Sequence, residues 1–206
     1  MQIGIIGAGH IGSALAANFI RAGHTVAIAN SRGPESLADL VGRLGPGARA
    51  VSAAEAADFG EVVVETIPFG KVPTLSALPL VGKVVIDTAN YYPQRDGQIE
   101  LGGLSQGAWV ARQLPGVRVV KAFNAIAAAD LAQDGDPSQP LEERRAIYVA
   151  SDDEDAKQSV MRLVEEMGFA ALDTGSLQDS AVHQTDGPLY GQKLSLEQAR
   201  EAVEPT

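Results

Sequence analysis

Three glycines near the N-terminus have the spacing of a phosphate-binding loop. Gly7, Gly9 and Gly12 follow the apolar run 2–6 and precede residues 11–23, whose apolar side chains recur at helical spacing. In such a loop the first glycine allows a tight turn, the second lets the backbone approach a pyrophosphate, and the third lets helix and strand pack closely. The amides at the helix start then face the anion, so we predict that this loop binds the pyrophosphate of a dinucleotide.

The residues between these glycines complete the predicted loop. Ala8, His10 and Ile11 are expected to line the pyrophosphate mainly through their backbone amides. An imidazole could also transfer protons, because its pKa lies near neutrality, but we interpret His10 as a lining residue. The other histidines, His24 and His183, are far apart in the chain, so the three do not form the pattern of a metal site.

A polar triplet ends the second predicted strand. Asn30, Ser31 and Arg32 lie where NAD-binding proteins carry an acid that binds the ribose 2′-hydroxyl, and Asn30 is 18 residues after Gly12. An acid would repel a 2′-phosphate, whereas a hydroxyl and a guanidinium would bind it. One charge-assisted hydrogen bond contributes about 1.5–3 kcal/mol, so Arg32 alone would favour NADP over NAD by roughly tenfold to a hundredfold. The triplet therefore predicts NADP(H) as the cofactor.

These residues need a scaffold that brings strand ends together, and the rest of the chain predicts one. Nearly all-apolar strands alternate with helices, which is typical of a parallel sheet covered on both faces. The predicted strands cover residues 2–6, 25–30, 61–68, 83–90, 117–123, 145–151 and 169–175, and the predicted helices cover 11–23, 34–44, 52–58, 103–114, 126–132 and 153–168. We predict an α/β fold, a Rossmann-type doubly wound parallel sheet with helices on both faces and a short C-terminal extension.

The length of 206 residues fits one domain. We predict a single NADP-binding Rossmann domain over residues 1–206, with a dinucleotide-binding core in about residues 1–125 and a smaller α/β part in about 126–206. The Pro-, Asp- and Gly-rich segment 133–145 is expected to be a surface loop, with a lid over the site as the alternative. The helical pattern in 194–204 could pack locally or dock on a second subunit, which would make the protein a homodimer.

The composition is that of an ordinary soluble protein, with 45% hydrophobic residues and a net charge of −10. Nucleic acids and anionic membranes attract basic surfaces, so neither is an expected partner. The apolar N-terminus is interrupted by glycines, and no other segment approaches the roughly 18 apolar residues of a membrane span. The chain has no cysteine, which excludes disulfides and thiolate chemistry and fits a cytoplasmic location.

Six segments carry a family resemblance: IGIIGAGHIGSALA, NSRGPESL, ETIPFGKV (65–72), VIDTANYY (85–92), LPGVRVVKAFNAI (114–126) and LDTGSL (172–177). Together they resemble the deazaflavin (coenzyme F420)-dependent NADP reductase family. VVKAFN and TGSL are also similar to the cytosolic oxidoreductase domain of the six-transmembrane metalloreductases. The resemblance implies hydride transfer between NADP(H) and a small-molecule redox acceptor, namely a deazaflavin (coenzyme F420), a flavin such as FAD or FMN, or a ferric chelate through a flavin.

The resemblance also implies roles for residues at the ends of later strands. One group would lie along the nicotinamide, and a second group would approach the nicotinamide and the acceptor ring. Ligands of open parallel sheets bind outside the carboxyl ends of strands, where both groups lie. The first group is Thr66, Ile67 and Pro68, and the second is Asn90, Ala122, Phe123 and Asn124.

We assign no catalytic acid or base. A hydride passes directly between two rings, so the protein has to hold them close and aligned, and Lys121, Asp87 and Glu65 are expected to satisfy hydrogen bonds at strand ends. Two alternatives stay open. One is a non-catalytic NADP(H)-binding module that senses redox state. The other, less favoured, is a truncated β-hydroxyacid dehydrogenase or pyrroline-carboxylate reductase-like enzyme, because about 30 residues after LDTGSL are too few for the helical second domain of those enzymes.

Overall fold

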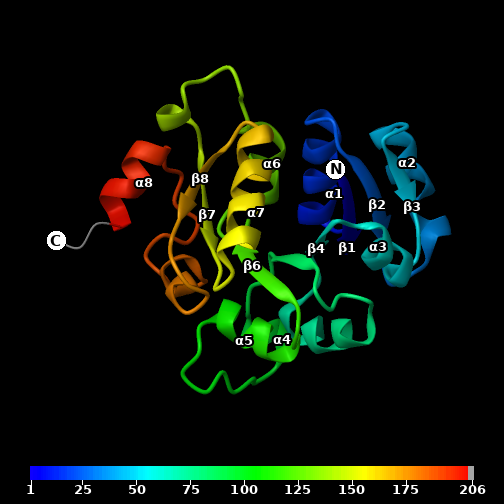
Figure 1. The fold of residues 1–206 in the computed structure, drawn as a ribbon, viewed down its shortest axis with the longest axis horizontal. Helices are drawn as coiled ribbons and strands as arrows, with labels where there is room; N and C mark the ends of the chain where they lie inside the picture. The colour runs from blue at the N-terminus through cyan, green and yellow to red at the C-terminus, as the bar shows by residue number, and fades with distance from the viewer. Residues whose placement is uncertain (204–206) are drawn as a thin grey trace.

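The computed structural model describes residues 1–203, and at its centre lies one eight-stranded sheet (Figure 1). The strand order is β3-β2-β1-β4-β5-β6-β7-β8. The chain therefore adds β2 and β3 on one side of β1, crosses back, and adds β4 to β8 on the other side. The strands are β1 (Gln2–Ile6), β2 (Thr25–Ala29), β3 (Ala48–Ala50), β4 (Val62–Glu65), β5 (Val84–Asp87), β6 (Arg118–Ala122), β7 (Ala146–Ala150) and β8 (Ala170–Asp173). The ends of β1 and β4 are neighbours at the point where the strand order reverses, where such folds bind ligands.

Helices cover both faces of this sheet (Figure 1). One face packs against α1, α6 and α7, and the other against α3, α5 and the 3₁₀ helix η2. The α-helices are α1 (His10–Arg21), α2 (Ala38–Leu44), α3 (Ala53–Phe59), α4 (Pro93–Asp96), α5 (Gln106–Gln113), α6 (Ala128–Gln133), α7 (Glu154–Glu166) and α8 (Leu196–Val203). The 3₁₀ helices are η1 (Pro34–Leu37), η2 (Phe69–Ala77), η3 (Leu141–Glu143) and η4 (Asp179–His183). The predicted Rossmann-type α/β fold is confirmed.

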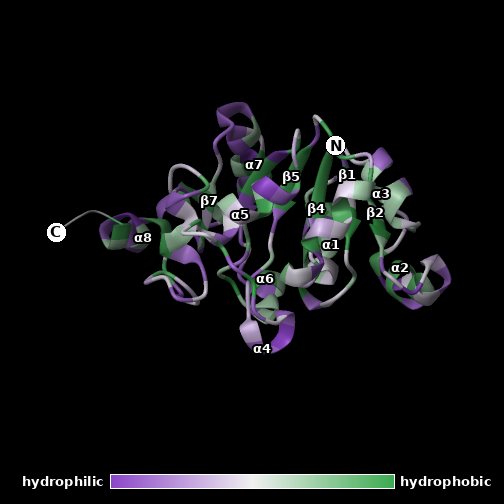
Figure 2. Cartoon of the chain, turned by 90° about the horizontal axis from the view of Figure 1, so that it is seen from below, coloured by the Kyte–Doolittle hydropathy of each residue, from purple (hydrophilic) through white to green (hydrophobic). Residues whose placement is uncertain are grey.

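The central strands are apolar up to their carboxyl ends, and both of their faces are covered (Figure 2). On β1, Ile3 and Ile5 belong to the core on one face, whereas Ile6 belongs to the core on the other. Successive side chains of a strand point to opposite faces, so a strand buried on both faces shows no alternation of polar and apolar residues. This is why continuous apolar runs predicted these strands well.

The edge strand β3 was missed by the sequence analysis. It has three residues, its middle residue Arg49 is exposed, and it pairs with β2 between Val26 and Ile28. A three-residue strand with an arginine at its centre has no apolar run to reveal it. The helix predicted over 34–44 is divided, because residues 34–37 form η1 before α2 begins at Ala38.

One junction departs from the predicted all-parallel sheet. The strands from β3 to β6 run parallel, and β7 and β8 run parallel to each other, but β7 is antiparallel to β6. Two residue pairs join β6 and β7, Lys121 with Ala150 and Ala122 with Val149. This register carries the start of β7 past the end of β6, alongside the turn after Ala122. The prediction was wrong here because an apolar run does not encode the direction of a strand.

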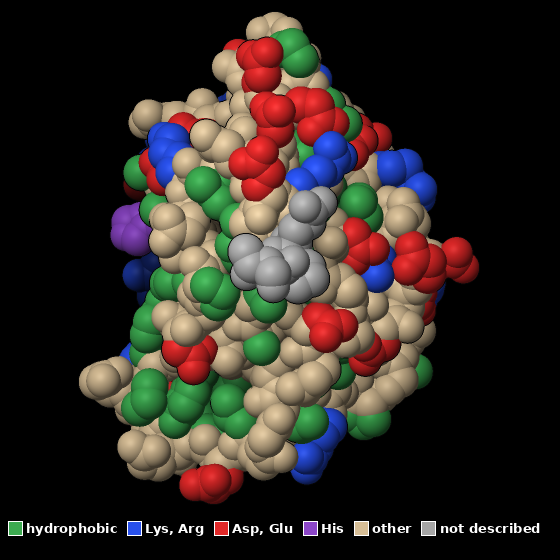
Figure 3. Space-filling model, turned by 90° about the vertical axis from the view of Figure 1, so that its left-hand side faces the viewer, with side chains coloured by type: hydrophobic (Ala, Val, Ile, Leu, Met, Phe, Trp, Pro, Cys, Tyr) green, Lys and Arg blue, Asp and Glu red, His purple; other side chains and the backbone are tan. Residues whose placement is uncertain are grey.

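The C-terminal segment packs back onto the β8 edge of the sheet. Helix α8 buries Leu196 and Ala199, and Arg200 Nη1 lies 2.6 Å from Glu142 Oε2. Of the helix predicted over 194–204, residue 204 lies outside the described residues. Figure 3 shows this end of the molecule, where acidic side chains gather along one edge and basic ones are scattered. Within residues 1–203, no helix is both long enough and apolar enough to cross a membrane.

Candidate functional site

The glycine loop joins β1 to α1 and is packed tightly against the end of β4. Gly7 has a φ of 117°, and a Cβ there would lie 2.4 Å from Thr66 Oγ1. A Cβ on Gly12 would lie 2.1 Å from the carbonyl oxygen of Gly7. Thr66 Oγ1 donates a hydrogen bond to that same oxygen at 2.8 Å. Two of the three glycines are therefore required by the packing of the loop itself.

Gly9 has a different environment, because a Cβ there would meet no heavy atom within 4 Å. Gly9 is the N-cap of the 12-residue helix α1, whose first turn has no acidic side chain. The first amides of a helix have no acceptor within it, and the helix dipole is positive at this end. The open space beside Gly9 thus fits an anion such as a pyrophosphate. His10 is exposed at the rim of the loop.

The end of β2 is shaped by the side chain of Asn30. Asn30 Oδ1 accepts a hydrogen bond from the Arg32 amide at 2.9 Å, and Nδ2 donates to Ser36 Oγ at 2.8 Å. This turn leaves Ser31 and Arg32 exposed. Within residues 1–203, the Arg32 guanidinium makes no hydrogen bond or ion pair of its own. The turn formed by Asn30 therefore leaves the Arg32 guanidinium available to a bound anion. A carboxylate in place of Asn30 would neutralise part of that positive charge.

An open cleft of about 700 Å³ connects the glycine loop with the turn after β2. We call it the nucleotide cleft. It brings together nine of the predicted residues, and four residues of η2 and its end that sequence analysis missed also line it. The predicted residues are Gly7, Ala8, Gly9, Asn30, Ser31, Arg32, Thr66, Ile67 and Pro68, and the additional ones are Lys71, Thr74, Leu75 and Leu78. A 3₁₀ helix that contains a proline has no period of 3.6 residues by which a sequence pattern could reveal it.

A second cleft of about 340 Å³ lies across the same wall. Thr66, Ile67 and Pro68 line both clefts, so they form the shared wall. The second cleft is also lined by the predicted residues Ile11, Asn90, Phe123 and Asn124, and by Thr88, Ala89, Tyr92, Arg95, Ile126 and Tyr190. Ala122 does not line either cleft, because it is fully buried where β6 pairs with β7. None of residues 133–145 lines either cleft, so the structure favours the surface-loop interpretation of that segment.

The turn after β6 is held in an unusual conformation at the second cleft. Phe123 has a φ of 60°, a left-handed conformation that costs a non-glycine residue roughly 1–2 kcal/mol. It orients Asn124, which donates hydrogen bonds to the His183 carbonyl at 2.7 Å and to Asn90 Oδ1 at 3.2 Å. Asn90 Nδ2 in return donates to the Asn124 carbonyl at 2.7 Å. The two asparagines thus lock the ends of β5 and β6 together.

His183 hydrogen-bonds to Asn124 of this pair. Its ring is fully buried, and Nδ1 lies 2.9 Å from Asn124 Oδ1. Burial, together with the positive charge of Lys121, lowers the pKa of His183 to about 3. The imidazole is therefore neutral near pH 7, and Nδ1 carries the proton that Asn124 accepts. A histidine that the sequence left without a partner is part of the scaffold of the second cleft.

Three charged side chains are fully buried at the ends of adjacent strands beneath the shared wall. They are Glu65 of β4, Asp87 of β5 and Lys121 of β6, which are cross-strand neighbours. Lys121 Nζ donates to Asp87 Oδ2 at 3.0 Å and also to the Ala89 carbonyl. Burial, reinforced by the Asp87 carboxylate, raises the pKa of Glu65 well above its usual range. Protonation of Glu65 leaves a balanced ion pair of Asp87 and Lys121.

Glu65 also ties the shared wall to the next strand. Its Oε1 accepts hydrogen bonds from the amides of Thr88 at 3.2 Å and Ala89 at 3.1 Å, and its Oε2 accepts one from Ile67 at 3.3 Å. These amides belong to residues that line the clefts. The expectation that Glu65, Asp87 and Lys121 satisfy hydrogen bonds at strand ends is confirmed. None of the three reaches a cleft surface, so they position the site.

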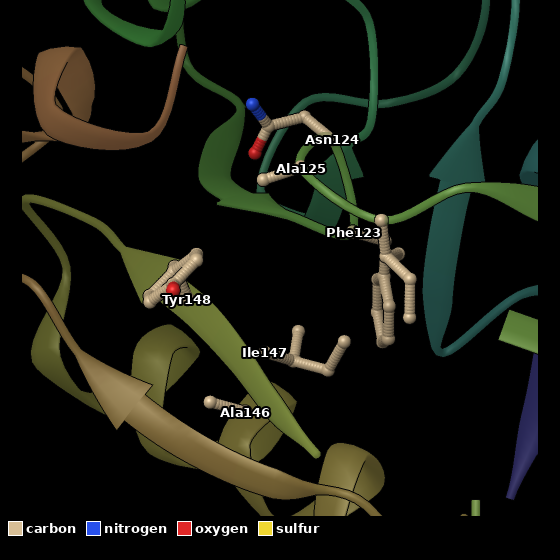
Figure 4. A pocket seen from close by; sticks show the side chains of 7 residues that line it. Phe123, Asn124, Ala125, Ala146, Ile147 and Tyr148 are labelled. Atoms are coloured by element: carbon tan, nitrogen blue, oxygen red, sulfur yellow. The ribbon is translucent and has the colours of Figure 1, made fainter. Parts of the chain in front are cut away.

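A small cavity lies beside the second cleft, between the turn 123–125 and strand β7 (Figure 4). Phe123, Asn124 and Ala125 line it from the turn, and Ala146, Ile147 and Tyr148 line it from β7. Its volume of about 10 Å³ is room for about one water molecule. It is too small to hold any part of a ring. Within residues 1–203, no group of three or more histidine, aspartate or glutamate side chains is arranged to hold a metal ion.

Comparison with known proteins gives the site a family context. Residues 2–91 match the model of the family described as NADP oxidoreductase, coenzyme F420-dependent. The chain is 31% identical over 178 residues to metalloreductase STEAP3 of Rattus norvegicus and 28% identical over 182 residues to metalloreductase STEAP2 of Homo sapiens. These alignments cover 85% and 86% of this chain but 34% of each relative. The chain therefore spans about a third of the length of the curated relatives that it matches.

Solved structures agree with the fold over most of the chain. A hypothetical protein of Sinorhizobium meliloti is 34% identical, with a TM-score of 0.84 and 95% of each chain covered. A candidate F420-dependent NADP reductase from Arthrobacter sp. FB24 is 25% identical, with a TM-score of 0.70 and 86% of each chain covered. A reductive aminase of Aspergillus terreus, solved with NADPH, has a TM-score of 0.63 at 19% identity and shows the shared fold alone.

Proposed function

We propose that this chain, whose residues 2–91 match the model of the coenzyme F420-dependent NADP oxidoreductase family, transfers a hydride between NADP(H) and a flavin- or deazaflavin-type ring. The observation that carries the proposal is the wall of Thr66, Ile67 and Pro68, which separates two clefts and lines both. A dinucleotide held in one cleft and a ring held in the other would meet along this wall.

Different residues of the nucleotide cleft would bind different parts of NADP(H). The open space at Gly9 and the start of α1 would take the pyrophosphate. Ser31 and Arg32 would bind the 2′-phosphate, and Lys71 adds a second cation to the same cleft. Leu75 and Leu78 offer an apolar surface for the adenine ring. This division explains how a chain with a net charge of −10 can bind a polyanion, since the cations are local.

The second cleft suits a reaction that needs position rather than proton transfer. Its ionisable side chains are Tyr92, Arg95 and Tyr190, and it is lined by no carboxylate and no imidazole within residues 1–203. When bound, NADPH supplies the hydride. The protein then has to exclude water and align two rings, which the wall and the paired asparagines Asn90 and Asn124 can do.

An acceptor screen tests the proposal directly. Purified protein is mixed with NADPH or NADH and with coenzyme F420, FMN, FAD or riboflavin, and the absorbance of the reduced nicotinamide is followed. A ferric chelate is added in a second series as the final electron acceptor. We expect NADPH to be oxidised in stoichiometric amounts by at least one ring acceptor, and NADH to be used roughly tenfold less efficiently or worse, as expected for a site with a 2′-phosphate ligand.

The same screen separates the proposal from a redox-sensing module. The second cleft has no acid–base pair, which is compatible with a protein that binds NADP(H) without turning it over. Tight binding of NADPH, seen as thermal stabilisation, with no oxidation by any ring acceptor would contradict hydride transfer and favour the sensor. Absence of NADPH binding would contradict both.

A further inference from the structure

Two tyrosines from distant parts of the chain meet at the second cleft. Tyr92 follows β5 and Tyr190 belongs to the C-terminal segment after η4, and their hydroxyl oxygens lie 2.5 Å apart. Both line the second cleft, together with the shared wall. Neither tyrosine was predicted as a site residue, because 98 positions separate them in the sequence.

The pair retains a hydrogen-bond donor that the protein does not use. Each phenol carries one O–H, and the contact between the two oxygens uses one of the two. The remaining contact is made by Asn90 Nδ2, which donates to Tyr190 Oη at 3.4 Å and so adds a donor rather than an acceptor. Within residues 1–203 no other group hydrogen-bonds to either hydroxyl. One O–H is therefore left for a molecule in the second cleft.

The surroundings hold this pair in place and keep Tyr190 protonated. The Arg95 guanidinium lies 5.0 Å from the centroid of the Tyr92 ring, and its Nη2 donates to the Asn90 carbonyl at 2.5 Å and to Asp96 Oδ2 at 2.8 Å. Arg95 thus contacts both Tyr92 and Asn90. Burial and the hydrogen bond with Tyr92 raise the pKa of Tyr190. The hydroxyl stays a donor over the whole physiological range.

We propose that the Tyr92–Tyr190 pair is the subsite for the polar edge of the hydride acceptor, where one phenol donates a hydrogen bond to a carbonyl of the ring. The inference rests on the proposed function. The ligand class is a planar heteroaromatic ring with carbonyl groups along one edge, which flavins and deazaflavins share. A cleft of about 340 Å³ lies in the usual size range for such ligands.

The chemistry of the transfer explains why a donor is useful there. A hydride carries one proton and two electrons, so its transfer oxidises the nicotinamide to its cation and leaves the acceptor with one more hydrogen and one more negative charge. That charge is shared with the ring carbonyls. A phenol O–H donates a stronger hydrogen bond to a charged oxygen than to a neutral one, so the pair stabilises the reduced acceptor more than the oxidised acceptor. No proton leaves the phenol, and water protonates the ring afterwards.

Binding and redox measurements with riboflavin, a flavin without a phosphate, test the subsite. With NADP⁺ present, riboflavin affinity is measured by fluorescence quenching for the wild type and for Tyr92→Phe/Tyr190→Phe. A neutral hydrogen bond contributes roughly 1 kcal/mol and a charged one about 1.5–3 kcal/mol. We expect the double variant to bind oxidised riboflavin about fivefold more weakly and the reduced form a further tenfold more weakly. The midpoint potential of the bound flavin then falls by about 30 mV for two electrons.

The single variants and a neighbouring tyrosine provide matched controls. Either single change frees the O–H of the remaining tyrosine, so each single variant is expected to lose about twofold or less in riboflavin affinity. The loss of binding free energy in the double variant should exceed the sum of the losses in the two single variants. Tyr91→Phe should change neither quantity, because the Tyr91 hydroxyl bonds to the Gly97 carbonyl and the Ile99 amide, both at 2.9 Å, and Tyr91 does not line the cleft.

The outcomes distinguish the subsite from the proposed function. Unchanged riboflavin affinity and potential in a double variant that still binds NADP⁺ would overturn the subsite alone. A wild type that binds NADP⁺ but neither riboflavin nor coenzyme F420 would overturn the proposed function and the subsite with it. If the double variant does not fold, thio-substituted riboflavins serve with the wild type, since sulfur is a weaker acceptor than oxygen. Unchanged affinity for both the 2-thio and the 4-thio compound would overturn the subsite.

Discussion

The nucleotide cleft and the second cleft share the wall of Thr66, Ile67 and Pro68, but they are built from different parts of the chain. The nucleotide cleft is formed within residues 6–78, largely by the backbone of one loop and by exposed side chains. The second cleft combines the ends of β5 and β6 with Tyr190, which comes from the C-terminal segment. One cleft is thus a local product of consecutive strand–helix units, and the other depends on contacts between distant segments.

The supports beneath the two clefts differ in the same way. The nucleotide cleft depends on close backbone contacts, which Gly7 and Gly12 permit. The second cleft depends on buried polar groups, namely the Asp87–Lys121 ion pair and the hydrogen bond from His183 to Asn124. We therefore expect crowding of the backbone to damage nucleotide binding first. We expect an unpaired buried charge, or a change of pH, to damage the second cleft first.

The largest effect is expected from breaking the buried ion pair. Lys121→Met would leave Asp87 buried without its partner, and loss of one member of such a pair costs roughly 3–5 kcal/mol. The free energy of unfolding is measured by urea denaturation. Lys193→Met is the control, because its side chain is 63% exposed and its ammonium pairs with Asp130 and Asp134 from the solvent side, where the expected loss is about 0–1 kcal/mol. Equal losses would contradict the role given to the buried pair.

Glycine substitutions sharpen the comparison on the nucleotide side. Gly12→Ala should lower stability by roughly 1–3 kcal/mol, because its Cβ would lie 2.1 Å from the Gly7 carbonyl oxygen. Gly9→Ala should leave stability unchanged but weaken NADPH binding by roughly tenfold to a hundredfold, since its Cβ would enter the open space assigned to the pyrophosphate. Urea denaturation and NADPH fluorescence titration give the two quantities.

The exposed Gly42 in α2 is the matched control for these two glycines, because a Cβ there also meets no heavy atom within 4 Å and it does not line a cleft. Gly42→Ala should not weaken NADPH binding. Full NADPH affinity in Gly9→Ala would contradict the position assigned to the pyrophosphate.

An effect of similar size on NADPH binding, but selective for the 2′-phosphate, is expected at the end of β2. Arg32→Ala should weaken NADPH by roughly tenfold to a hundredfold and NADH by less than about twofold, because NADH lacks the 2′-phosphate. Lys71→Ala, in the same cleft, should show the same preference with a loss of less than about tenfold, since its side chain is exposed. Equal losses for both dinucleotides in Arg32→Ala would sink the 2′-phosphate assignment.

The last effect depends on pH and belongs to the second cleft. The pKa of His183 is about 3 in the folded protein and near 6.5 in the unfolded chain, so below pH 6.5 the unfolded state binds more protons. The stability that neutral His183 contributes is complete above pH 6.5 and is lost as the pH falls toward 3, by at most about 1.4 kcal/mol per pH unit. Urea denaturation between pH 7 and pH 4 should show a shallower decline for His183→Gln than for the wild type.

His10→Gln provides the control for that pH series, because His10 is exposed and belongs to the nucleotide side. We expect His10→Gln to follow the wild-type decline. The same decline in His183→Gln would mean that the buried imidazole is not the group that titrates.

The residues of the two clefts could also be predicted from the sequence to different degrees. The glycine loop and the triplet after β2 are local patterns, and the nucleotide cleft brings Gly7, Gly9 and Arg32 together. The later strand ends were recognised through a family resemblance, which also included Ala122 although it is fully buried. Lys71 lies on a 3₁₀ helix that has no sequence signal. Tyr190 and His183 reach the site only because the chain after β8 folds back over the end of β6.

By itself the sequence determined the α/β class, the phosphate loop and the charge at the end of β2. Each of these depends on residue types and spacings within a few tens of residues, where strand and helix periodicity act. Only the tertiary structure decided the direction of β7, the partner of His183 and the meeting of Tyr92 with Tyr190. Those features depend on which distant surfaces bury each other, and burial is a property of the whole chain rather than of any segment.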